Sequence, residues 1–165
     1  MTTAAPSVIE LLELLEQRGA TLATAESLTG GRVAAAVTAV PGSSACFVGG
    51  VVAYATAVKE SVLGVPRAVI DQHGVVSAEC ARAMASGVRA LTGATYAVST
   101  TGVAGPGDQD GVRAGTVYVG VAGPGSPTVV ALELSGGRSV VQEQATREAL
   151  SAVAAILEVE ETGLG

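Results

Sequence analysis

Aromatic side chains and positive charges are both scarce in this chain of 165 residues. One Phe, three Tyr and no Trp leave Ala, Val and Leu to build the hydrophobic core, and these small side chains suit close packing of helices on a sheet. The formal net charge is −6. Because nucleic-acid binding depends mainly on Lys and Arg that neutralise phosphates, we expect no nucleic-acid partner.

Cysteine, histidine and long apolar runs are also rare. Cys46 and Cys80 form no CxxC pair and His73 is the only histidine, so the sequence predicts no metal site and two reduced thiols. No apolar run reaches the roughly 20 residues of a membrane span, and the N-terminus lacks the basic region of a signal peptide. We therefore expect a cytoplasmic protein with no membrane partner.

Hydrophobic residues make up 48% of the chain and charged residues 15%, which predicts one compact domain over residues 1–165. Helical and strand patterns alternate along it. The expected helices are 6–18, 32–41, 56–63, 80–91 and 138–157, the last followed by a loose acidic tail, and the expected strands are 20–25, 46–54, 94–100, 115–122 and 128–134. The last two strands predict a hairpin, and the whole pattern predicts a three-layer α/β sandwich with a mixed sheet and helices on both faces.

A serine lies where a buried strand passes into a glycine-initiated helix. Ser27 follows the strand that ends near Ala25, and Gly30 and Gly31 precede an apolar helix. Unpaired N–H groups at a helix N-terminus stabilise anions, including the oxyanion of an acyl-transfer intermediate. The alternative is a tight turn in which Ser27 or Thr29 only caps the helix.

Two further segments carry candidate groups. A glycine-rich stretch at 99–107 follows another buried strand and leads into a polar loop at 108–113, which predicts a second wall of one crevice. Lys59 follows a third strand in a lysine-poor chain. Burial in a cleft lowers a lysine pKa, so that a lysine can act as a general base toward a serine, whereas an isolated lysine is ordinarily a surface residue.

Five segments in the same order resemble the CinA C-terminal domain family: AESLTGG, VVAYATAVKESVLGV, HGVVSAE, TTGVAGPG and GTVYVGVAG. This family includes nicotinamide-nucleotide amidases. The resemblance therefore implies metal-free and cofactor-free hydrolysis of nicotinamide mononucleotide (NMN) to nicotinate mononucleotide and ammonia, in pyridine-nucleotide salvage. It also makes a homo-oligomer, such as a dimer, plausible.

The resemblance assigns the site residue by residue. It implies that Ser27 is the nucleophile, that Lys59 is its base and that Tyr54 belongs to the catalytic group. Backbone N–H groups near Thr29, Gly30 and Gly31 are expected to hold the oxyanion. The residues expected to bind substrate are therefore Thr29, Gly30, Gly31, Thr101, Gly102, Gly105 and Arg138.

The chain departs from the family pattern at several positions. Leu28 replaces a cysteine, Thr56 an asparagine and Gln142 a second arginine, and the loop at 108–114 differs as well. Two alternatives to NMN hydrolysis therefore stay open. One is a CinA-like domain that binds a nucleotide-like ligand without efficient turnover and serves in competence or damage responses, and the other is an amidase with a different pyridine or small amide substrate.

Overall fold

The computed structural model describes residues 6–163 and contains five strands in one sheet. Their order is β2-β1-β3-β4-β5, formed by β1 (Leu22–Glu26), β2 (Phe47–Val52), β3 (Tyr96–Gly102), β4 (Thr116–Ala122) and β5 (Thr128–Glu133). β1 runs parallel to both β2 and β3, whereas β3–β4 and β4–β5 are antiparallel. The predicted mixed sheet and its terminal hairpin are confirmed.

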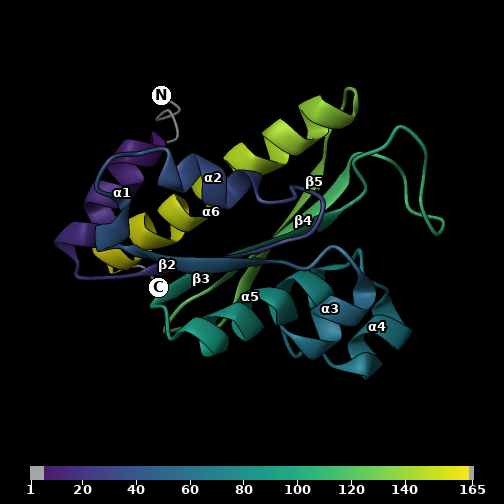
Figure 1. The fold of residues 1–165 in the computed structure, drawn as a ribbon, viewed down its shortest axis with the longest axis horizontal. Helices are drawn as coiled ribbons and strands as arrows, with labels where there is room; N and C mark the ends of the chain where they lie inside the picture. Colours follow the sequence, from purple (N-terminus) through teal and green to yellow (C-terminus); the bar gives the residue numbers. More distant parts are fainter. Residues whose placement is uncertain (1–5, 164–165) are drawn as a thin grey trace.

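Helices cover both faces of this sheet, so the three-layer prediction is also confirmed (Figure 1). One layer contains α1 (Val8–Gln17), α2 (Arg32–Thr38) and α6 (Arg138–Thr162). The opposite layer contains α3 (Thr56–Ser61), α4 (Arg67–His73) and α5 (Ala78–Thr92), and a 3-10 turn, η1 (Ser43–Ala45), precedes β2. Each layer closes its own apolar cluster against the sheet.

Local sequence signals explain where several helices begin and end. Ser7 and Glu10 form a reciprocal capping box at the start of α1. The Ser77 hydroxyl accepts the Cys80 N–H at 3.1 Å, and Gly93 ends α5 in a left-handed conformation. Among residues 6–163, no helix is both long enough and apolar enough to cross a membrane.

The end of α6 differs from the prediction, because the helix continues to Thr162 instead of giving way to a loose tail after Leu157. Arg18 at the end of α1 donates to the Leu157 carbonyl at 2.7 Å and forms ion pairs with Glu160 and Glu161. The Tyr96 hydroxyl also donates to Glu160. These contacts from distant segments hold the acidic last turns in place.

Candidate active site

The carboxyl ends of three parallel strands meet at one edge of the sheet. β1 leads into Ser27, β2 into Tyr54, and β3 ends at Thr101 and Gly102. β2 and β3 lie on opposite sides of β1, so this edge is a topological switch point, where ligands bind in open α/β sheets. A crevice opens there, and seven of the predicted site residues line it: Ser27, Tyr54, Lys59, Thr101, Gly102, Gly105 and Arg138.

The only lysine of the sequence contacts the serine. Lys59 Nζ lies 2.9 Å from Ser27 Oγ, although the two residues are 32 positions apart in the chain. The same nitrogen lies 2.7 Å from the Ala53 carbonyl oxygen and 3.2 Å from that of Tyr54. Only 2% of Lys59 is exposed. The end of β2 and the first turn of α3 thus aim the amine at the end of β1.

Burial lowers the pKa of Lys59, because water no longer solvates its charged form. A Cys80 thiolate would oppose this shift, but burial raises the pKa of the Cys80 thiol to about 11 and keeps it uncharged near neutral pH. Lys59 forms no ion pair within residues 6–163. A neutral amine has two hydrogens for the two carbonyls and one lone pair for the Ser27 hydroxyl proton. The three contacts suit this neutral amine, and they equally suit an ammonium that donates to all three oxygens, so burial is the feature that favours the neutral form.

Three hydrogen bonds hold the turn that carries Ser27. The Ser27 N–H donates to the Thr100 carbonyl at 3.0 Å, and the Gly30 N–H donates to the Ser27 carbonyl at 3.1 Å. From α6, the buried Gln142 amide donates to the Leu28 carbonyl at 2.9 Å. Gln142, which departs from the family pattern, therefore supports the serine turn instead of lining the crevice.

Thr29, Gly30 and Gly31 do not line the crevice, in contrast to the expectation from sequence. The Thr29 hydroxyl is buried and donates to Glu26 Oε1 at 2.7 Å. The same carboxylate accepts the Val33 and Ala34 N–H groups of α2 at 2.8 and 3.1 Å. The protein's own Glu26 carboxylate thus occupies the N-terminus of α2, where the sequence predicted that a substrate anion would bind.

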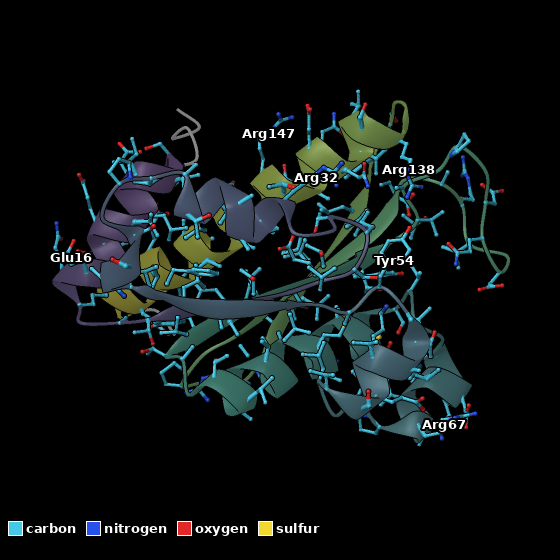
Figure 2. All side chains as sticks on the ribbon, viewed as in Figure 1. Glu16, Arg32, Tyr54, Arg67, Arg138 and Arg147 are labelled. Atoms are coloured by element: carbon cyan, nitrogen blue, oxygen red, sulfur yellow. The ribbon has the colours of Figure 1, made fainter. Side chains whose placement is uncertain are left out.

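Two hydrogen bonds join residues from three separate motifs at the rim of the crevice. Arg138, the first residue of α6, donates to the Gly105 carbonyl at 2.7 Å and to the Tyr54 hydroxyl at 3.0 Å. Tyr54 is 61% exposed, and Figure 2 shows it near Arg138, beside the loop that follows β3. The Tyr54 phenol therefore lies at the rim, whereas the Tyr54 carbonyl reaches Lys59.

The β3 side supplies a wall with little free volume. The buried Thr101 hydroxyl donates to the Val75 carbonyl at 2.6 Å, and Val75 and Val76 line the crevice. A Cβ at Gly102 would lie 2.6 Å from the Thr116 carbonyl oxygen, so only glycine fits between β3 and β4. Val75 and Val76 belong to the HGVVSAE segment but were not predicted to line the site, because an apolar pair ahead of a helix cap carries no chemical signal.

Comparisons with known proteins agree with this geometry. A family model for the CinA C-terminal domain matches residues 5–157. The chain belongs to the CinA family. A "CinA-like protein" of Frankia casuarinae is 48% identical over 147 residues, which cover 89% of this chain and 34% of the relative. A "CinA-like protein" of Myxococcus xanthus is 52% identical over 121 residues, which cover 72% and 28%. This CinA domain thus spans about a third of the length of these relatives.

Solved structures of the CinA superfamily share the fold. A superfamily protein from Klebsiella pneumoniae has a TM-score of 0.87 at 35% identity, covering 93% of this chain and 99% of its own. One from Escherichia coli has a TM-score of 0.86 at 27% identity, covering 94% of each. Within residues 6–163 of this CinA domain, no group of three or more His, Cys, Asp or Glu side chains is placed to hold a metal ion.

Proposed function

We propose that this CinA domain hydrolyses the carboxamide of NMN to nicotinate mononucleotide and ammonia. The contact between Lys59 Nζ and Ser27 Oγ, in a crevice at the sheet's switch point, is the observation that carries the proposal. A serine needs a base to become a nucleophile, and a lysine is a base only when it is neutral. Burial without an anionic partner favours that neutral form.

In the proposed reaction the Ser27 oxygen attacks the amide carbon while its proton passes to Lys59. The C–N bond of the resulting tetrahedral intermediate breaks, and the proton on Lys59 goes to the leaving nitrogen, which departs as ammonia. Water then attacks the acyl-enzyme, gives a proton to Lys59 and releases the carboxylic acid as the proton returns to Ser27. The Ala53 and Tyr54 carbonyls stabilise the transient ammonium.

The Leu28 N–H is the donor that we propose for the oxyanion. Leu28 lines the crevice, and within residues 6–163 its N–H has no protein acceptor. The Gly30 N–H instead donates to the Ser27 carbonyl, which fixes the plane of the Ser27–Leu28 peptide. In a trans peptide the N–H points opposite to the C=O, so the Leu28 N–H points away from Gly30. In α/β-hydrolases the residue after the nucleophilic serine supplies a donor of this kind.

Arg138 is the group that we propose for the substrate phosphate. It is the one arginine that lines the crevice among the described residues, and a guanidinium has five N–H donors, of which the Gly105 and Tyr54 contacts occupy two. Its two protein acceptors hold it in place before a ligand arrives, which reduces the entropy lost on binding. Tyr54 then has two roles in the site: its phenol holds Arg138 at the rim, and its carbonyl contacts Lys59.

Ammonia release from NMN by the purified protein tests the proposal. We expect Ser27→Ala and Lys59→Ala each to abolish turnover, and the double variant to be no worse than either, because the two residues act as one unit. Ser61→Ala, an exposed position on the same helix as Lys59, is the matched control. If folded wild type binds NMN without turning it over, the chain is a ligand-binding domain. If it releases ammonia only from another amide, the substrate is different.

A further inference from the structure

Glu26 is a buried acidic residue next to the site, and it takes no part in the proposed reaction. Glu26 is 1% exposed and directly precedes Ser27, and its carboxylate accepts three hydrogen bonds, from Thr29 Oγ1 and from the N–H groups of Val33 and Ala34. Burying an isolated carboxylate is costly, and three donors, two of them at the positive end of a helix, offset that cost. Burying an apolar side chain of similar volume carries a smaller desolvation penalty, so the need to fill this position does not explain why it holds a carboxylate.

We propose that Glu26 is a positioning residue that sets the distance between Ser27 Oγ and Lys59 Nζ. This inference rests on the proposed function of the Ser27–Lys59 pair. The turn at 27–31 has Glu26 at one end and the start of α2 at the other. Because the Glu26 carboxylate binds Thr29 within the turn and Val33 and Ala34 just beyond it, one side chain closes the turn on itself.

A second contact carries the network to the neighbouring strand. Thr29 Oγ1 lies 2.8 Å from Thr100 Oγ1, and the Ser27 N–H lies 3.4 Å from that same Thr100 hydroxyl oxygen. An ionised carboxylate only accepts, so the Thr29 proton points to Glu26 and the Thr100 hydroxyl donates to Thr29. The acceptor at Glu26 therefore orients the hydroxyl protons of Thr29 and Thr100, in a chain of hydrogen bonds that ends at the Ser27 backbone.

A fixed turn is needed because Ser27 and Lys59 come from different layers of the fold. Ser27 follows β1, whereas Lys59 lies on α3 on the opposite face from α2. Their 2.9 Å contact persists only if the turn does not shift against the sheet. A displacement of about 1 Å at a reacting group costs on the order of 100-fold in rate.

The reaction of Ser27 with a fluorophosphonate, followed by intact mass, tests the inference without assuming a substrate. Glu26→Gln preserves the shape, but its single acceptor oxygen cannot receive all three donors, and its NH₂ must face an N–H group. We expect labelling of Glu26→Gln to be about 100-fold slower than that of wild type. With NMN, kcat should fall by a similar factor while KM stays unchanged, because the Arg138 rim is untouched.

Ser99→Ala is the matched control. Ser99 lies on β3, and its buried hydroxyl donates to the Ala81 carbonyl at 2.6 Å on the opposite side of the sheet. This variant loses a buried hydrogen bond, as Glu26→Gln does, but it should label at the wild-type rate. Equal rates in wild type and Glu26→Gln overturn the inference alone. No labelling of Ser27 in wild type, with Ser27→Ala as the blank, overturns the proposed nucleophile and this inference together.

A second pair decides the matter if Glu26→Gln does not fold. Thr29→Val removes the hydroxyl that joins Glu26 to Thr100 with almost no change in volume, and Thr29→Ser keeps that hydroxyl. We expect labelling to be about tenfold slower in Thr29→Val, and most of the rate to be recovered in Thr29→Ser. Identical rates in these two variants overturn the positioning role.

Discussion

At the scale of single residues, the proposed reaction depends on the protonation state of Lys59. Lys59→Arg keeps a long basic side chain at this position, but a guanidinium cannot lose its proton in a protein and therefore cannot act as a base. A general base contributes about 10²–10⁴ in rate, so we expect Lys59→Arg to lose ammonia release by at least that factor while circular dichroism shows a folded chain. Activity near the wild-type level in Lys59→Arg would exclude the neutral-amine mechanism.

Lys59 also makes stability depend on pH. Its pKa is lowered from 10.5 in the folded protein, so between the lowered value and 10.5 the unfolded chain binds more protons than the folded one. The free energy of unfolding therefore rises with pH across that window, by about 1.4 kcal/mol for each unit of the shift. Below the window the full cost of burying the amine is present, and above it that cost is gone.

Lys59→Met isolates this contribution, because the Cys80 thiol and the other titrating groups are common to both proteins. Urea unfolding at a series of pH values should show that the free energy of unfolding of Lys59→Met exceeds that of wild type most below the lowered pKa of Lys59, and that this difference shrinks as pH rises through the window. Parallel curves up to pH 11 would mean that the pKa of Lys59 is not lowered.

At the scale of elements, α5 packs against the segment that follows α3, the helix that carries Lys59. A Cβ at Gly87 would lie 1.9 Å from the Leu63 carbonyl oxygen, in the segment between α3 and α4. Replacing glycine by alanine inside a helix ordinarily stabilises the helix by about 1 kcal/mol, but a steric clash with backbone destabilises the fold by about 1–3 kcal/mol or more. We expect Gly87→Ala to be destabilised and, since α3 must shift, to lose activity.

Ser86→Ala is the control for α5, because it changes the helix propensity at an exposed neighbouring position. Thermal unfolding and ammonia release should both stay close to wild type. If Gly87→Ala were instead as stable as Ser86→Ala, the close approach of α5 to Leu63 would be wrong.

At the scale of the whole molecule, Arg18 joins the first and last helices far from the crevice. Its guanidinium donates to the Leu157 carbonyl and pairs with Glu160 and Glu161. Charge-assisted hydrogen bonds contribute about 1.5–3 kcal/mol, whereas partly exposed ion pairs contribute about 0–1 kcal/mol. We therefore expect Arg18→Ala to lower the free energy of unfolding by about 1–3 kcal/mol and to leave kcat/KM unchanged.

The exposed Arg82 of α5 provides the comparison, because Arg82→Ala removes the same charge at a surface position. Urea unfolding should distinguish the two arginine variants, while their activities should match. A lower kcat/KM in Arg18→Ala, at a temperature where the variant is fully folded, would contradict this expectation and show that the α1–α6 contact affects activity at the crevice.

Local patterns predicted most of the elements correctly, because their causes are local. Ser7 with Glu10 and Ser77 ahead of α5 are caps that need only a few neighbouring residues. The end of α6 could not be predicted in this way. Arg18 and Tyr96, which hold Glu160, are far from it in sequence, and an acidic stretch without them is typical of a frayed terminus.

The α/β alternation, the family and the residue types at the site could all be predicted from the sequence, because hydrophobic periodicity, helix caps and motifs in a fixed order are local features of the chain. Three features needed the folded structure: the contact between Lys59 and Ser27, the burial that lowers the pKa of the Lys59 amine, and the position of the Glu26 carboxylate at the start of α2. A pKa depends on burial and on neighbouring groups, and a hydrogen bond needs a partner within about 3 Å. At this site those neighbours come from segments that are distant in the chain, so local sequence patterns do not reveal them.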